Sequence, residues 1–226
     1  MSYLAERRQE EKERRRLEIL SAAAEVASVV GFEAMTMDQV ARKARLSRAL
    51  VYVYFKDKQD LLVGLCVRAL EILRERFDAA VAAEHQGFAK VEACGRAYVS
   101  FAHDHPILFD ALAHVEAHAP IGDDPSYDSH LKAGESLHSV LIGAIEYGMA
   151  DGSVRRDAGS ATLLAFTLWG LMHGVLQITQ HKCGSLEMAG VSPAQLIEQG
   201  FAFAAQALAT AAVGKPAPGR AAALEV

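Results

Sequence analysis

The residues with the clearest chemical potential are four histidines in the segment HDHPILFDALAHVEAH, residues 103–118. His114 and His118 are four positions apart, a spacing that places two imidazoles on one helix face and can hold zinc or nickel. No cysteine lies near, and Glu116 lies between the two histidines, so the segment is not the HExxH pattern of a metalloprotease. Two ligands without a third make a poor metal site, so surface or capping histidines are the simpler interpretation, and we expect no metal and no other cofactor.

The same segment offers the acid–base groups that a helical enzyme would need. Its histidines stand beside Asp104, Asp110 and Glu116, which can donate or accept protons. The sequence contains no glycine-rich phosphate loop, no GxSxG and no metal-binding motif that would support catalysis. We therefore predict that the protein is not an enzyme, and a helical enzyme built on the His103–His118 region remains an alternative.

A second chemically useful group lies in ARLSRALVYVYF, residues 44–55, where two arginines flank a serine and two tyrosines follow. The stretch 42–58 carries one acid, Asp57, against six basic residues: Arg42, Lys43, Arg45, Arg48, Lys56 and Lys58. The whole chain has a net charge of −5. A local basic patch on an acidic chain is typical of a module that contacts DNA, although a solvated charged face has the same composition.

Helical periodicity dominates the chain, and no strand pattern recurs. Thr36 and Gln39 form a capping-box pattern, and Ser47, Asp57 and Ser192 are good N-caps. The pattern predicts an all-α fold of about nine helices: one that begins within 6–16 and ends at Gly31, then Met37–Ala44, about 48–54, 58–84, 88–104, 107–118, 126–150, 158–181 and 193–213.

These boundaries make residues 44–55 a turn followed by a short helix, despite their β-prone valines and tyrosines. The side chains expected to face inward are Leu46, Val51 and Phe55. Those expected to face outward are Arg48, Ala49, Tyr52 and Val53, with Tyr54 at the edge. A capped helix, a three-residue turn and a short helix that presents Arg and Tyr outward are the parts of a helix-turn-helix.

The apolar segment ATLLAFTLWGLMHGVLQIT, residues 161–179, contains no Asp, Glu, Lys or Arg and has the length of a membrane helix. It also contains Thr, His, Gln and Gly, and no second such segment exists. We therefore expect the buried centre of a helical domain or dimer rather than a membrane span. Three scattered cysteines without a CxxC pair, and an N-terminus unlike a signal peptide, predict a reducing, cytoplasmic location.

Residues 19–62 resemble the TetR family of bacterial transcriptional regulators, in order and without gaps. The resemblance is carried by Ile19-Leu20, Ala22-Ala23, Gly31-Phe32, Thr36, Val40-Ala41, Ala44, Leu46-Ser47, Val51-Tyr52, Tyr54-Phe55, Lys58 and Leu61-Leu62. It implies an N-terminal DNA-binding domain over residues 1–56 and a helical ligand-binding and dimerisation domain over residues 57–213. The tail, 214–226, has no periodicity, and residues 221–226 look like a linker left by cloning.

The resemblance also implies roles in DNA contact. The residues at major-groove positions are Arg48, Ala49, Leu50, Tyr52 and Val53, and those at phosphate-contacting positions are Thr36, Tyr54 and Lys58. Ser47 would cap the recognition helix and touch the DNA backbone, and Arg48 can make a bidentate contact to guanine.

Two departures from the family are visible in the same stretch. Arg45 stands where the family usually has glycine; if that position needs a positive φ, arginine costs about 1 kcal/mol more than glycine, which a phosphate contact can offset. Ala49 and Leu50 replace a frequent Gly-Thr, so the base specificity cannot be copied from a relative.

Beyond residue 88 the resemblance implies an inducer site and a dimer interface. The side chains suited to an apolar pocket, each of which is also consistent with simple core, are Phe101, Phe109, Phe166, Trp169, Met172 and His173. The last helix carries an apolar stripe that would form either a dimer interface or an intramolecular contact: Ile197, Gly200, Phe201, Ala204 and Leu208.

Together these observations predict a sequence-specific DNA-binding transcriptional regulator. The leading hypothesis is a homodimeric repressor that a small, largely apolar inducer releases from double-stranded operator DNA. One alternative is a DNA-binding regulator on the same fold without a small-molecule ligand, and the other is the helical enzyme described above.

Overall fold

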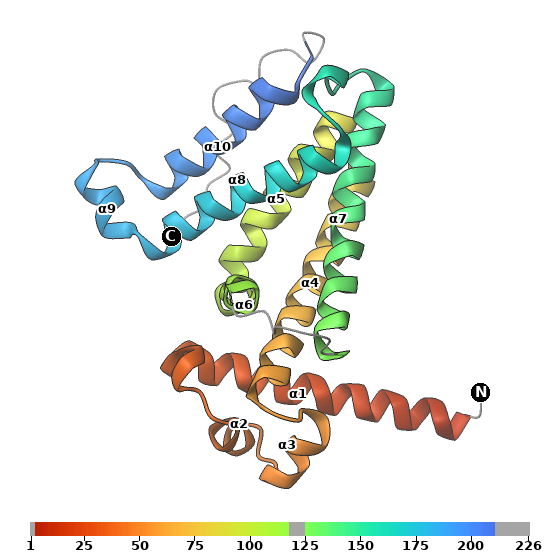
Figure 1. The fold of residues 1–226 in the computed structure, drawn as a ribbon, viewed down its shortest axis with the longest axis vertical. Helices are drawn as coiled ribbons and strands as arrows, with labels where there is room; N and C mark the ends of the chain where they lie inside the picture. Colours follow the sequence, from red (N-terminus) through yellow and green to blue (C-terminus); the bar gives the residue numbers. More distant parts are fainter. Residues whose placement is uncertain (1–2, 118–124, 211–226) are drawn as a thin grey trace. The chain divides into compact units, whose positions relative to one another are not determined.

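The computed structural model describes residues 3–117 and 125–210, and the chain is helical over almost all of them (Figure 1). The elements in chain order are α1 (Tyr3–Ala34), α2 (Met37–Lys43), α3 (Arg48–Tyr54), α4 (Lys58–Ala83), α5 (Gly87–Asp104), α6 (Pro106–Ala117), α7 (Pro125–Asp151), a 3₁₀ turn (Arg156–Ala158), α8 (Ala161–His181), α9 (Cys183–Met188) and α10 (Pro193–Leu208). Within the described ranges, β structure is limited to one isolated bridge between Val154 and Ala209. The predicted all-α class is confirmed.

Side-chain caps begin the helices where the sequence predicts them. The Thr36 hydroxyl accepts from the Gln39 N–H at 3.3 Å, and the Thr36 N–H donates to Gln39 Oε1 at 2.8 Å, which completes a capping box. Ser47 and Asp57 each accept a hydrogen bond from the N–H three residues further on, at 3.2 and 2.8 Å. Ser192 forms a second capping box at the start of α10. These caps satisfy N–H groups that have no partner inside the helix.

α1 begins at Tyr3 and continues beyond its predicted end at Gly31. The run of mixed charge at 6–16 supports this long start, because acids and bases pair along the helix, as Arg15 Nη1 and Glu18 Oε2 do at 2.7 Å. Gly31, the predicted end, has the expected positive φ, 78°, and interrupts the helix. Helical structure then resumes as far as Ala34.

Two other differences lie in the C-terminal third. α10 ends at Leu208 rather than at 213, because the backbone there pairs with residues 153–155 instead of continuing the helix: the Arg155 N–H donates to the Leu208 carbonyl at 2.9 Å, and the Thr210 N–H donates to the Ser153 carbonyl at 3.2 Å. The six-residue α9 was absent from the predicted helices, since it contains a glycine and is too short for an apolar stripe to reveal it.

The first compact unit consists of residues 1–72 and 101–135. In it α1 packs against α2 and α6, and α2 packs against α3. Its fully buried side chains include Ile19, Ala23, Met35, Val40, Val51, Phe55, Leu61, Phe101 and Phe109. This shared core holds α3 with one face inward, which leaves its other face to solvent.

The second compact unit consists of residues 73–100 and 136–226. In it α10 packs against α8. The start of α5 is capped from the end of α7, because Asp151 and Ser153 accept hydrogen bonds from the N–H groups of Gly87 and Phe88 at 2.8 and 2.9 Å. α4, α5 and α7 each contribute residues to both units, whereas the domain boundary predicted from sequence falls just before α4.

Candidate nucleic-acid interface and ligand cavity

The turn between α2 and α3 has the geometry of a helix C-cap followed by a left-handed residue. Arg45 has a φ of 57°, so the position does need the positive φ that glycine adopts without strain. The Leu46 N–H donates to the Ala41 carbonyl at 2.9 Å, the long-range bond of a Schellman motif. Among the described residues Arg45 is the one non-glycine with positive φ.

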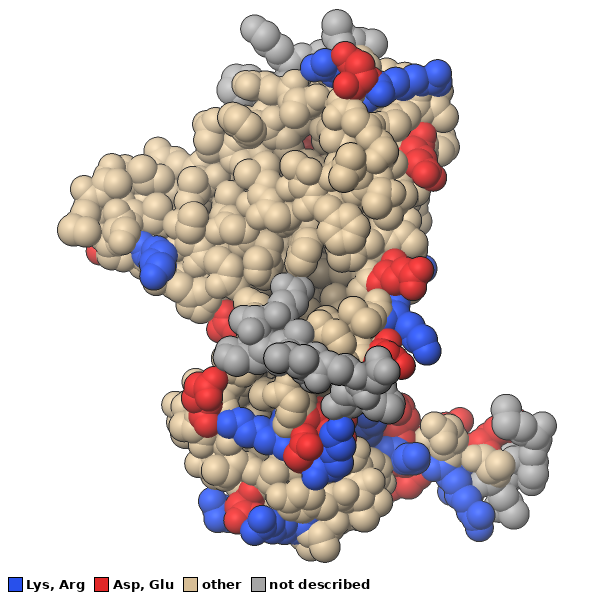
Figure 2. Space-filling model, viewed as in Figure 1, with Lys and Arg blue, Asp and Glu red and all other residues tan. Residues whose placement is uncertain are grey.

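α3 presents the face that the sequence predicts. Val51 and Phe55 are buried, at 0% and 1% exposure, and anchor the helix in the core of the first compact unit. Tyr52 and Val53 are exposed, at 40% and 76%, and Arg48 and Ala49 are exposed with them. Leu50 and Tyr54 are half-buried at the edges. Lys and Arg side chains, with some acids among them, gather over this helix-turn-helix (Figure 2).

Arg48 is held by two neighbours. Its Nε lies 3.1 Å from Asp38 Oδ1, its Nη1 donates to Asp38 Oδ2 at 3.3 Å, and its Nη2 lies 3.5 Å from the Tyr52 hydroxyl. The Tyr52 hydroxyl and the Asp38 carboxylate raise the pKa of Arg48 above its ordinary value. Sequence reasoning missed Asp38, because a contact across ten positions and two helices leaves no periodic signal.

The remaining predicted DNA contacts lie on the same helix-turn-helix and the start of α4. Thr36 and Ser47 are exposed N-caps, with hydroxyls engaged by their own helices. Lys58 Nζ donates to the Glu33 carbonyl at 2.6 Å, so it binds the end of α1 in the structure. Tyr54 shares a shallow surface hollow with the charged start of α1, including Arg7, Arg8, Lys12 and Arg14.

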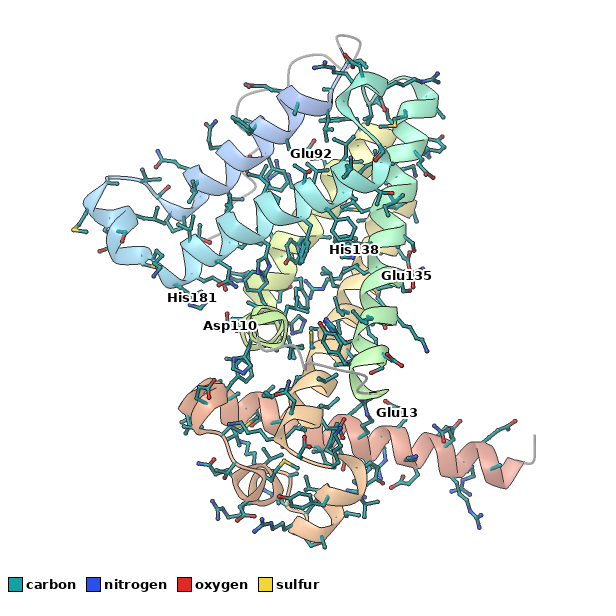
Figure 3. The ribbon with its side chains drawn as sticks, viewed as in Figure 1. Glu13, Glu92, Asp110, Glu135, His138 and His181 are labelled. Carbon is teal, nitrogen blue, oxygen red and sulfur yellow. The ribbon has the colours of Figure 1, made fainter. Side chains whose placement is uncertain are left out.

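The second compact unit contains a cavity of about 960 Å³. Side chains of α4, α5, α7, α8 and α10 line it, including Phe77, Phe88, Glu92, Cys94, Arg96, Tyr98, His138, Trp169, Met172, Glu198, Gln199, Phe201, Ala204 and Leu208. His138 points from α7 toward α8, where its ring stacks on Phe166 at 4.6 Å and meets the edge of Trp169 at 5.4 Å between centroids (Figure 3).

The six side chains that the sequence suggests for a pocket are placed in three ways. Trp169 and Met172 belong to the cavity wall. His173 lies behind it and shares a 2.7 Å hydrogen bond with the wall residue Tyr98. The other three are outside the wall: Phe166 is partly exposed on α8, whereas Phe101 and Phe109 are core residues of the first compact unit.

Burial changes the chemistry of two groups at the cavity. It raises the pKa of the Cys94 thiol to about 12, which keeps this cysteine in its unreactive protonated form. Burial also lowers the pKa of His173, which favours the neutral imidazole that shares a hydrogen bond with Tyr98. Both residues therefore contribute neutral rather than charged groups near neutral pH.

One ion-pair cluster supplies all the formal charge of the described cavity wall. Arg96 on α5 reaches Glu198 on α10 through its two terminal nitrogens, at 2.6 and 3.3 Å, and Glu92 at 3.1 Å. The Arg96 guanidinium also lies over the Phe201 ring, 4.2 Å from its centroid. Arg96 and Glu198 are 102 positions apart, so no local pattern could have predicted their pairing.

The α10 stripe predicted for a dimer interface lies mostly against the chain's own helices. A Cβ added to Gly200 would meet Met172 Sδ of α8 at 3.3 Å, and Phe201, Ala204 and Leu208 line the cavity. Ile197 is half-buried. These residues therefore make contacts within the chain, and their part in a dimer interface stays a prediction.

A second set of apolar side chains on α8 and α10, called here the exposed face of α8 and α10, is open to solvent. Its large side chains are Leu163, Phe166 and Ile178 of α8 and Phe203 of α10, and few charged residues appear over these helices (Figure 2). Gly170 and Gly174 have open space where a Cβ would stand. α8 is also long and apolar enough to cross a membrane, and 28% of its most apolar stretch is buried within the chain.

The histidine cluster has no metal-site geometry in the part of the chain that the structure describes. His114 Nε2 lies 3.8 Å from Glu33 Oε1, and its ring packs on Phe32 at 5.2 Å between centroids. His118 lies outside the described residues. No group of three or more His, Cys, Asp or Glu side chains converges on one point in residues 3–117 and 125–210.

Known proteins share both halves of this architecture. Residues 19–65 match the family described as bacterial regulatory proteins of the tetR family, and residues 91–204 match the tetracyclin repressor-like C-terminal domain. The transcriptional repressor NicS of Pseudomonas putida is 30% identical over 154 residues, which cover 66% of this chain and 70% of NicS.

Two solved structures illustrate the likeness in fold. A protein of unknown function from Rhodococcus sp. RHA1 has a TM-score of 0.70 at 23% identity, covering 87% of this chain and 96% of that one. The transcriptional regulator FadR of Bacillus subtilis, solved in complex with stearoyl-CoA, has a TM-score of 0.66 at 14% identity, covering 85% and 97%. With a helix-turn-helix at one end and a matching helical C-terminal domain, the chain belongs to the TetR family of bacterial transcriptional regulators.

Proposed function

We propose that this regulator is a cytoplasmic homodimeric repressor that reads operator DNA with α3 and leaves it when a small molecule fills the cavity. Residues 1–56 would form the DNA-binding domain and residues 57–213 the ligand-binding and dimerisation domain. The observation that carries the proposal is the exposed face of α3, where Arg48, Ala49, Tyr52 and Val53 stand on a helix anchored by buried Val51 and Phe55.

The chemistry of this face suits a major groove. Arg48 can make a bidentate hydrogen bond to guanine, and Ala49 and Val53 can contact thymine methyl groups. Around the helix, exposed Arg42, Arg45 and Lys56 offer positive charge to the phosphates. The family membership supports DNA binding as such, whereas these individual contacts are part of the proposal.

The dimer would form through the exposed face of α8 and α10. Leu163, Phe166, Ile178 and Phe203 would bury their apolar surface against the partner, and Gly170 and Gly174 would let two α8 helices approach closely. Such a dimer would also explain why a helix as apolar as α8 is so little buried within one subunit.

Selection of bound sequences from a library of random DNA duplexes tests the proposal. We expect the protein to enrich a near-palindromic site with half-site centres one helical turn, about 34–36 Å, or a multiple of it apart. Affinity for that site should fall steeply as salt rises, because each neutralised phosphate releases counterions.

The matched variants are Arg48→Ala, which removes a cation from α3, and Lys132→Ala, which removes an exposed cation from α7. Arg48→Ala should abolish enrichment of one base position in each half-site, and Lys132→Ala should leave the selected sequence unchanged. A protein that enriches no sequence, or that binds DNA without dependence on salt, would rule the proposal out.

A further inference from the structure

The cavity wall is rich in flat aromatic rings. Phe77 comes from α4, Phe88 and Tyr98 from α5, Trp169 from α8 and Phe201 from α10. The volume of about 960 Å³ lies at the upper end of the range of small-molecule sites, roughly 300–1,000 Å³. Rings on several sides of a large cavity favour a ligand with an apolar, ring-containing body.

The charge on the wall argues against an acidic ligand. Arg96 is the one lysine or arginine among the described wall residues, and two carboxylates, Glu92 and Glu198, already bind its terminal nitrogens. The three side chains sum to a formal charge of −1. These side chains are 42–54% exposed, so the cluster lies where the cavity meets solvent. A ligand carboxylate that approaches it would meet excess negative charge, or would have to displace a carboxylate that is already paired.

The wall also offers a neutral hydrogen-bond donor. The indole N–H of the wall residue Trp169 makes no hydrogen bond to another described residue, and it is not a fully buried nitrogen, so it is open to a solvent or ligand acceptor. An indole N–H can donate but cannot accept, so its natural partner in a ligand is a carbonyl or ether oxygen. Such a bond would fix one end of an otherwise apolar molecule.

We propose that the cavity selects an uncharged, ring-containing apolar ligand that carries a carbonyl-type acceptor, and rejects the corresponding carboxylate. The inference rests on the proposed function only in that this ligand would be the inducer. The ion-pair cluster of Arg96 with Glu92 and Glu198 determines this specificity, because two protein carboxylates already bind the guanidinium that a ligand carboxylate would need. Trp169 is the anchoring donor.

The first test compares two ligands that differ in one group: progesterone, a four-ring ketone, and the steroid carboxylate in which a carboxylate replaces its acetyl group. Displacement of the neutral dye Nile red reports binding for both. The single tryptophan of the chain, Trp169, gives an independent signal through its own fluorescence. We expect the ketone to bind at least tenfold more tightly than the carboxylate.

Two variants then separate the elements of the site. Glu92→Gln with Glu198→Gln leaves Arg96 without a carboxylate, and should raise affinity for the carboxylate at least tenfold while the ketone changes by less than twofold. Retained ketone binding also shows that this variant is folded. Trp169→Phe should weaken ketone binding about fivefold, the value of one neutral hydrogen bond. The matched control, Glu146→Gln with Glu187→Gln, removes two exposed carboxylates outside the wall and should change neither affinity.

Three results would overturn the ligand class: equal binding of ketone and carboxylate, no displacement of Nile red by the ketone, or no gain for the carboxylate in the double glutamine variant. A different result would contradict the proposed function. If the ketone binds as expected and the selected DNA is never released, then the ligand class holds and the induction mechanism is wrong.

Discussion

Asp38 connects two helices of the helix-turn-helix through one side chain. Its carboxylate holds the Arg48 guanidinium by two contacts, at 3.1 and 3.3 Å, and leaves the arginine exposed on α3. A guanidinium held in one orientation loses less conformational freedom when it meets a base edge. The same carboxylate would repel a phosphate, so we expect Asp38 to favour a base contact over a backbone contact in the proposed role of Arg48.

Asp38→Asn therefore should reduce specificity rather than affinity. We expect the ratio between the selected operator and a duplex changed at the Arg48-dependent base to fall about tenfold, while affinity for random DNA stays equal or rises. Fluorescence anisotropy with both duplexes measures the ratio. Glu25→Gln, which breaks the exposed pair with Lys43 on another helix, is the control and should keep the ratio. An unchanged ratio in Asp38→Asn would mean that Asp38 has only a structural role.

The three cysteines should differ sharply in reactivity. Cys183 is exposed, whereas Cys66 is fully buried and burial raises the pKa of Cys94 to about 12. Since the thiolate is the reactive species, iodoacetamide at pH 8 should add one group to the native protein and three to the unfolded protein. Intact mass spectrometry counts the adducts, and Cys183→Ser should show none while folded. Rapid labelling of Cys94 in the native state would contradict the burial of the cavity wall.

At the scale of elements, α5 and α7 meet at a pair of glycines. A Cβ on Gly87 would stand 2.1 Å from the Gly148 Cα, a backbone atom that cannot rotate away. Two backbones so close leave no room for any side chain at the crossing. This contact sits beside the hydrogen bonds through which Asp151 and Ser153 cap α5.

Gly87→Ala should consequently destabilise the second compact unit by about 1–3 kcal/mol, the usual cost of overpacking. Gly143→Ala in α7 is a matched control, because Gly143 is exposed and nothing lies within 4 Å of its added Cβ. That change should stabilise the helix by roughly 0.5–1 kcal/mol. Urea denaturation measures both, and equal effects of the two substitutions would contradict the close crossing.

Some features of the elements can be predicted from the sequence and others cannot, because they depend on residues that are close together or far apart along the chain. The caps at Thr36, Ser47 and Ser192, and the inward and outward faces of α3, follow from residues within a few positions of each other. The cavity depends on contacts such as Arg96 with Glu198, which no local pattern encodes. An apolar stripe also does not specify the surface that it packs against. The stripe of α10 is therefore compatible with both a dimer interface and a contact inside the chain.

At the scale of the whole molecule, the exposed face of α8 and α10 is the surface through which we propose that two subunits pair. Leu163 of α8 and Phe203 of α10 are 68% and 64% exposed, and large apolar side chains that gather on a surface mark an interaction site. If that face joins two subunits, then a charge placed on it would meet the same charge on the partner across the two-fold axis.

Leu163→Glu with Phe166→Glu should therefore convert the dimer to a monomer at micromolar concentration and weaken operator binding by more than tenfold. Sedimentation velocity measures the first effect, and anisotropy with the selected duplex measures the second. Val29→Glu places a charge on another exposed apolar residue, in α1, and should leave the protein dimeric. A doubly substituted protein that stays dimeric would move the interface elsewhere.

At Arg45 the left-handed backbone would set the stability of the fold against the proposed phosphate contact of its side chain. Glycine adopts this backbone conformation without strain, whereas arginine at a φ of 57° raises the free energy of the folded state by about 1 kcal/mol. Arg45→Gly should then raise the melting temperature by a few degrees while it removes a cation from the turn. With Arg45 the domain has a lower free energy of unfolding than its glycine variant. It should therefore tolerate fewer destabilising substitutions elsewhere than that variant does.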